Sequence, residues 1–175
     1  MSASEEIIKR VRARAFNNDN RYSCCSQAVL EALQEEFKIG NSQSLKSATA
    51  LDGGVACLGE TCGAVIGALM ALGLVIGREK MEDTLAYDNT GNASRELIER
   101  FKVELQKHFE FKEKLESTLC RDIQKKILGR SFNFLDEKEN QAFLNVGAHT
   151  ERGCLTVCAI AAEAHLRGAR CLPTR

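Results

Sequence analysis

The chain has 175 residues, which is enough for one domain with a substantial hydrophobic core and too few for two such domains. Its 24 Lys and Arg residues balance 24 Asp and Glu residues, so it lacks the basic surplus that binding to nucleic acid or an anionic membrane would use. Residues 1–14 alternate charged and apolar side chains and lack the apolar core of a secretory signal. We therefore expect a single cytoplasmic domain spanning residues 1–175, without nucleic acid as a partner.

Apolar residues recur at helical spacing through most of the sequence, and one Pro, two Tyr and no Trp leave few signals for strands or turns. The predicted fold is therefore all-α, a compact helical bundle. The first helix begins near residue 4 and ends in the Asn-rich stretch 17–20, and Ser23 is expected to cap the second. Helices are predicted in chain order over residues 4–17, 24–39, 44–51, 63–77, 93–116, 119–128, 138–146 and 154–167, with a polar stretch at 78–91 and a loop at 147–153.

The segment 63–77 is apolar throughout, apart from its glycines. A membrane-spanning helix needs roughly 20 such residues, so this shorter segment predicts a buried central helix of a bundle and no membrane span. Gly63, Gly67 and Ala71 recur every four residues. Small residues at this spacing form a flat ridge that allows a neighbouring helix to approach closely.

Eight cysteines make the chain cysteine-rich. Because the cytosol keeps thiols reduced, these cysteines favour metal binding or redox chemistry over structural disulfides. Free cysteines are also common as small buried apolar residues, which is the alternative for any one of them. The sequence contains no CxxC and no CxxCH, and the glycine spacing of Gly54 and Gly59 is followed by Glu60 and Thr61 rather than by the Lys of a phosphate-binding loop.

Four cysteines lie where helices are predicted to start. Cys25, Cys62 and Cys154 fall in the first turn of a predicted helix, and Cys120 lies near the start of another. The backbone N–H groups and the positive end of the helix dipole favour thiolate there, so we expect thiol pKa values below the usual value of about 8.5. Four such thiolates repel one another unless a cation joins them or they oxidise in pairs.

The segments around these cysteines carry a recognisable pattern. They read Cys25-Ser-Gln-Ala-Val-Leu30, Gly59-Glu-Thr-Cys-Gly-Ala-Val-Ile-Gly67, Cys120-Arg-Asp-Ile123 and Cys154-Leu-Thr-Val-Cys158. Over about residues 20–166 the chain resembles the family of redox-active proteins named after its C-GCAxxG-C-C pattern of four cysteines. The resemblance implies a compact helical domain with the four cysteines near one another. A similar domain occurs in a multihaem cytochrome to which an iron–sulfur centre has been ascribed, which favours a cluster here.

The leading hypothesis is that Cys25, Cys62, Cys120 and Cys154 bind an iron–sulfur cluster that stores electrons or passes them to a redox partner protein. Thiol–disulfide chemistry without metal, with Cys62 as the attacking thiol, is the first alternative. A structural zinc site and a plain binding module with buried cysteines are the others. The sequence identifies no reaction, so an enzymatic role is left open, and a homodimer is compatible with it.

The other cysteines and the histidines receive weaker predictions. Cys24 is expected to point away from Cys25, Cys158 to lie in the core, and Cys171 to be incidental in the C-terminal tail, while the role of Cys57 is left open. His149 lies in a loop five residues before Cys154 and is kept as an unfavoured replacement ligand. His108 and His165 are expected at the surface.

Overall fold

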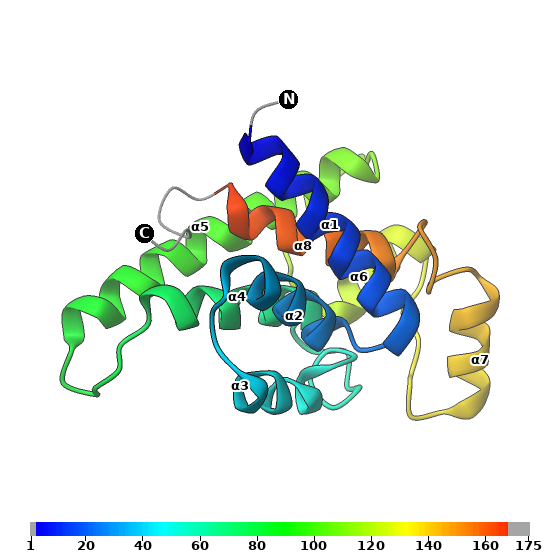
Figure 1. Ribbon diagram of the computed structural model, residues 1–175. Helices are drawn as coiled ribbons and strands as arrows, with labels where there is room; N and C mark the ends of the chain where they lie inside the picture. Colours follow the sequence, from blue (N-terminus) through cyan, green and yellow to red (C-terminus); the bar gives the residue numbers. More distant parts are fainter. Residues whose placement is uncertain (1–2, 168–175) are drawn as a thin grey trace.

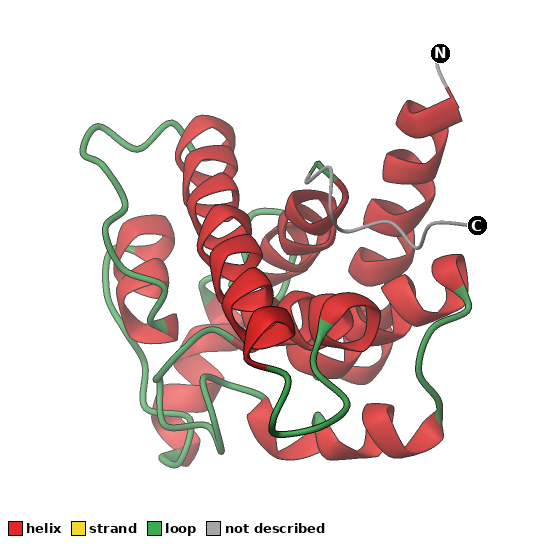
Figure 2. Ribbon diagram, turned by 90° about the vertical axis from the view of Figure 1, so that its left-hand side faces the viewer, coloured by secondary structure: helices red, strands yellow, loops and turns green. Residues whose placement is uncertain are grey.

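The computed structural model describes residues 3–167, and within this range the protein is all-helical (Figures 1 and 2). The all-α prediction is confirmed. An isolated bridge between Thr61 and Leu119 is the one pairing of strand type among these residues. The elements are α1 (Ala3–Tyr22), α2 (Cys25–Phe37), α3 (Ser42–Ser47), the 3-10 helix η1 (Thr49–Leu51), α4 (Gly63–Ile76), α5 (Thr84–His108), α6 (Cys120–Leu128), α7 (Glu137–Asn145) and α8 (Cys154–Leu166).

The bundle is built on α1, α2, α4, α5 and α8. Helix α1 packs on both α2 and α8, α2 packs on α4, and α5 covers α4 and α8 (Figure 1). Their apolar faces merge into one continuous core, in which Phe101, Leu97 and Leu105 of α5 are fully buried. Helices α3 and η1 pack against α2. Within the described residues, no helix is both long and apolar enough to cross a bilayer.

The predicted glycine ridge sits at the contact between α2 and α4. A Cβ atom on Gly67 would lie 2.3 Å from the carbonyl oxygen of Ser26, and one on Gly63 would lie 2.5 Å from the Cys25 sulfur. Real Cβ atoms do not approach other atoms this closely, so only glycine fits at either position. The close approach of α2 to α4 therefore depends on these two residues, and it brings Cys25 against the start of α4.

Helix α8 is buried more completely than α4. Every residue from Leu155 to His165 is buried, whereas Leu74 of α4 is 40% exposed. The buried carboxylate of Glu163 forms ion pairs with Arg12 of α1 and with Arg167. Pairing of this kind offsets the cost of removing a carboxylate from water. Helix α8, which begins at Cys154, is thus the more deeply buried of these two helices.

Three predicted helix boundaries are wrong. Helix α5 begins at Thr84 rather than at residue 93, because the side chain of Asp83 accepts a hydrogen bond from the Ala86 N–H and caps it. It ends at His108 rather than near residue 116, since Glu110 adopts a left-handed backbone conformation (φ 52°) that stops the helix. Helix α1 continues through the Asn-rich stretch to Tyr22.

The predicted cap of α2 is also wrong. Ser23 has a left-handed backbone (φ 52°), and no side chain of the N-cap residue, Cys24, caps the helix. The first N–H of α2, that of Cys25, instead donates to a carboxylate oxygen of Asp52 at 2.8 Å. Asp52 thus fixes the start of α2 from a distant segment of the chain.

Helix α7 is set apart from the bundle (Figure 1). It is held by a second, small apolar cluster that contains Phe132, Phe143 and Ala148, with Phe134 packed against it. The rings of Phe132 and Phe134 both meet Phe143 edge-on, at centroid distances of 5.6 Å and 4.9 Å. Such contacts favour a defined packing. They place α7 along one side of a cavity that is lined by cysteines.

Candidate functional site

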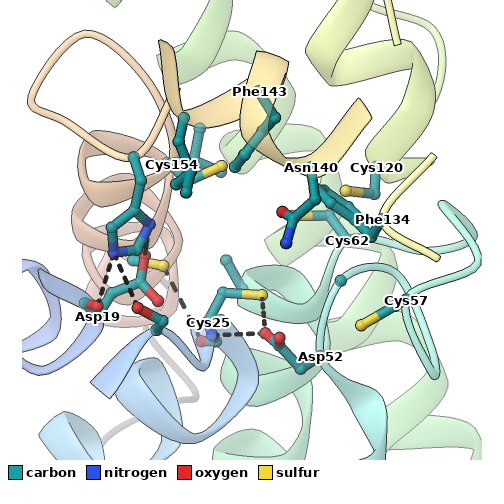
Figure 3. A pocket seen from close by; sticks show the side chains of 17 residues that line it. Asp19, Cys25, Asp52, Cys57, Cys62, Cys120, Phe134, Asn140, Phe143 and Cys154 are labelled. Atoms are coloured by element: carbon teal, nitrogen blue, oxygen red, sulfur yellow. Dashed lines mark hydrogen bonds and ion pairs between the residues drawn. The ribbon is translucent and has the colours of Figure 1, made fainter. Parts of the chain in front are cut away.

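One cavity of about 360 Å³ lies where α2, α4, α6 and α8 begin (Figure 3). This volume is within the range of small-molecule pockets, about 300–1,000 Å³. Its wall includes all four cysteines of the sequence hypothesis, together with two further cysteines. The six are Cys25, Cys57, Cys62, Cys120, Cys154 and Cys158.

Each of the four predicted cysteines starts a helix, as the sequence indicated. Cys25, Cys120 and Cys154 are the first residues of α2, α6 and α8, and Cys62 is the N-cap of α4. In all four, the residue's own N–H is already bonded elsewhere in the fold. The acceptors are Asp52 Oδ1 for Cys25 (2.8 Å), Thr118 O for Cys62 (2.9 Å), Glu60 O for Cys120 (2.6 Å) and Ala148 O for Cys154 (2.8 Å).

The thiols of these cysteines do not have the low pKa values expected from their helix positions. Burial raises the pKa of Cys62 to about 12 and that of Cys120 to about 11, and it raises those of Cys25 and Cys154 well above the ordinary value. Backbone N–H groups of Ala64 and Val65 oppose the rise at Cys62 but do not outweigh it. Removal from water disfavours the charged thiolate more than the helix ends favour it. Without a cation, the cavity therefore holds neutral thiols at neutral pH.

Two of the four sulfurs have defined hydrogen bonds. The Cys25 thiol lies 3.0 Å from Asp52 Oδ1 and donates to it. The Cys120 sulfur accepts a hydrogen bond from the buried amide of Gln124 at 3.2 Å. The orientation of that amide is fixed because its oxygen accepts from the Phe132 N–H at 2.8 Å. Gln124 thus presents a donor to sulfur, an arrangement that stabilises the sulfur's negative form.

The segment between η1 and α4 has an unusual backbone. Residues 53–57 all have positive φ values, between 51° and 76°. Gly53 and Gly54 adopt this conformation without cost, whereas for Val55 it is a strained state. A Cβ atom on Gly54 would lie 2.7 Å from that of Cys120, so this turn packs directly against the start of α6. The turn also brings Cys57 into the cavity wall.

A carboxylate and an imidazole complete the other side of the cavity. Asp19 of α1 is 2% exposed, and His149 lies with its Nδ1 3.9 Å from Asp19 Oδ2. The pKa of Asp19 is raised to about 6, chiefly by burial, while His149 and a hydrogen bond with Cys158 act in the opposite direction. The sequence held a signal for Asp19, because it continues the buried stripe of Val11 and Ala15 at intervals of four residues.

The outer wall is made by α7 and the segment before it. Phe134, Phe143 and Leu144 contribute apolar surface, and Asn140 contributes an amide (Figure 3). Leu144 is 48% exposed, so this wall borders solvent. The cavity is thus lined by thiols from the bundle, has apolar side chains of α7 along its outer wall and is partly open to solvent.

The remaining sequence predictions have mixed outcomes. Cys158 is buried, as expected, but it also lines the cavity. Cys24 does not line it, and Cys171 lies outside the described residues. His165 is wrongly predicted, because it is fully buried on α8 with its Nδ1 3.2 Å from the carbonyl oxygen of Ala68. His108 is exposed.

The spacing of the donor atoms bears on what the cavity can hold. Among residues 3–167, no three Cys, His, Asp or Glu side chains come close enough together to hold a single metal ion. The seven cysteines in this range are free thiols. The four predicted ligands share one cavity with open space between them. Their assignment as a ligand set stays a prediction.

These features define a protein that is all-helical over residues 3–167 and has a partly open, thiol-lined cavity where four helices begin. A family model described as "Putative redox-active protein (C_GCAxxG_C_C)" matches residues 23–166, which is most of the chain. The protein belongs to this family. Comparisons with curated proteins and with solved structures find no match.

Proposed function

We propose that the cavity holds an iron–sulfur cluster through Cys25, Cys62, Cys120 and Cys154, and that the protein uses it in electron transfer. The observation that carries this proposal is the meeting of the four cysteines at one cavity from four separate helix starts. Four thiolates are a complete ligand set for a cluster, and a set made only of sulfur suits iron–sulfur chemistry.

The spacing of the thiols supports a cluster over a structural zinc ion. Zinc binds thiolate at about 2.3 Å, so its four sulfurs must almost touch one another. The described residues contain no such group. The thiolates of a cluster bind more than one iron, and the sulfide ions fill the space between them. A cavity with thiols on its wall and open volume at its centre fits the second arrangement.

The protonation state of the thiols supports a cluster over thiol–disulfide exchange. The attacking species in exchange is the thiolate, and burial raises the pKa of the Cys62 thiol to about 12. A neutral, buried Cys62 is therefore a poor nucleophile. Iron replaces the thiol proton and supplies the positive charge that the buried sulfur lacks, so cluster assembly releases protons and is favoured by higher pH.

The test is purification without oxygen, followed by analysis of iron, acid-labile sulfide and zinc. We expect brown protein with iron and sulfide in matching amounts. Cys62→Ser should lose both, while Cys24→Ser is the matched control and should keep both, because Cys24 does not line the cavity. Colourless wild-type protein, or protein with stoichiometric zinc, would contradict the proposal. A metal-free protein that reversibly loses two thiols on oxidation would support disulfide chemistry instead.

A further inference from the structure

A buried carboxylate on the cavity wall, that of Asp19, has the Cys158 thiol and the His149 imidazole as its side-chain partners. Asp19 is 2% exposed, and its Oδ2 is buried without a hydrogen-bond partner among the described residues. Leaving a buried carboxylate oxygen unpaired costs stability, and the buried Glu163 shows that this fold can pair such a group with arginines. Asp19 is one of the residues that line the thiol cavity.

His149 links this carboxylate to the protein surface. Its Nδ1 is 3.9 Å from Asp19 Oδ2, and its side chain is 20% exposed. Its Nε2 lies 3.1 Å from the backbone oxygen of Asp19 and 3.3 Å from the hydroxyl of Ser23, which is exposed. The imidazole therefore has one ring nitrogen, Nδ1, near the Asp19 carboxylate and the other, Nε2, near a surface hydroxyl, as a proton carrier requires.

We propose that Asp19 takes up a proton when the cavity is reduced, and that His149 carries this proton between Asp19 and solvent. This inference rests on the cluster proposed above. One electron from a one-electron donor protein enters the cluster, and one proton from solvent passes through His149 to convert the Asp19 carboxylate to the carboxylic acid. Oxidation reverses both transfers. The net charge of the cavity is then the same in both states, which avoids adding an uncompensated charge to a buried site.

The surroundings of Asp19 put its titration in a useful range. The ionisable groups that interact electrostatically with Asp19 are His149, Asp52, Cys24 and Cys25 of α2, Cys62 of α4, and Cys154 and Cys158 of α8. Burial and Asp52 raise its pKa, and His149 and Cys158 lower it, which leaves it at about 6. An added electron in the cavity raises the pKa further. Reduction of a cluster in the cavity would therefore favour the uptake of a proton by Asp19.

The test is a spectroelectrochemical titration of the loaded protein between pH 6 and pH 9. The midpoint potential of the wild type should fall with pH, by up to about 59 mV for each tenfold drop in proton concentration, the one-electron value. Asp19→Asn keeps the shape of the side chain but cannot ionise, so its potential should not change with pH. Glu163→Gln, which also removes a buried carboxylate but lies outside the cavity wall, should keep the wild-type slope.

His149→Gln separates the carrier from the acceptor. Its equilibrium potential should keep the wild-type slope, whereas its reduction by dithionite in a stopped-flow experiment at pH 8 should slow at least threefold. A slope that survives in Asp19→Asn would overturn the proposal, and a slope lost in His149→Gln alone would move the proton to the imidazole.

Carbon-13 NMR of the metal-free protein gives an independent readout. One aspartate carboxyl resonance, absent from Asp19→Asn, should titrate near pH 6. The absence of such a resonance would contradict the assignment even if Asp19→Asn failed to load. A loaded wild type with a pH-independent potential overturns the relay alone, whereas a wild type without iron and sulfide removes the proposed function and the relay with it.

Discussion

Two glycines of the same helix should respond in opposite ways to the same substitution. A Cβ on Gly67 would lie 2.3 Å from Ser26 O and 3.1 Å from Val29 Cβ, whereas a Cβ on Gly73 would meet nothing within 4 Å. A carbon–oxygen contact normally needs about 3.3 Å, so Gly67→Ala forces α2 and α4 apart by about 1 Å. Overpacking of this kind costs about 1–3 kcal/mol.

The helix propensity gained is the same in both variants, about 1 kcal/mol, so comparing them isolates the steric cost. Gly73→Ala should be more stable than the wild type, and Gly67→Ala should be about 1–3 kcal/mol less stable than Gly73→Ala. Urea unfolding followed by circular dichroism measures both. In a chain of this length the difference corresponds to roughly 2–12 °C in melting temperature. Equal stability of the two variants would refute the close contact of α2 with α4.

Three further predictions concern the cavity itself. Gly63→Ala should lower the iron content more than Gly73→Ala does, because its Cβ would lie 2.5 Å from the Cys25 sulfur; unchanged iron would contradict the packing. The free energy of unfolding of the metal-free protein should fall between pH 8 and pH 10, with roughly 2–4 kcal/mol of the loss from Cys62 and Cys120, since unfolded thiols ionise near 8.5 while these two stay protonated up to about 12 and about 11. Urea titrations would show this loss, and a Cys62→Ser/Cys120→Ser variant should show a smaller one. Gln124→Leu removes the donor to the Cys120 sulfur and leaves a buried N–H unpaired, so it should cost about 1–3 kcal/mol and lower the midpoint potential of the cluster. An unchanged potential would show that this hydrogen bond does not reach the redox centre.

The buried thiols stabilise the folded protein only while they stay protonated. The folded thiols have raised pKa values, so their contribution to stability is fully present below the pKa of the unfolded thiol. It is lost as the pH rises from there through the folded values. Bound iron changes this dependence, because a thiolate that holds metal no longer carries the proton.

Local signals in the sequence were sufficient to predict most of the helices and the position of the four cysteines at helix starts. Apolar periodicity located the helices, and Cys25, Cys62, Cys120 and Cys154 each begin a helix as expected. The early start of α5 was missed because its first turns are exposed and present no buried apolar stripe, and only the cap by Asp83 marks them.

The properties of the cavity depend on contacts between distant segments, which the sequence does not display. Asp52 caps α2 across 27 positions of the chain, and the left-handed turn that follows it brings Cys57 into the same wall. The expected low thiol pKa values failed for the same reason. The burial that raises them arises only when four helices and the cover from α7 meet, and no single helix start contains that information.

The most direct measurement is an anomalous difference map at the iron absorption edge, from crystals grown without oxygen. The proposed function predicts iron peaks inside the cavity, bonded to the sulfurs of Cys25, Cys62, Cys120 and Cys154, and an unliganded sulfur at Cys24. A cavity without iron in protein purified under these conditions, or a pair of these cysteines joined as a disulfide, would contradict it.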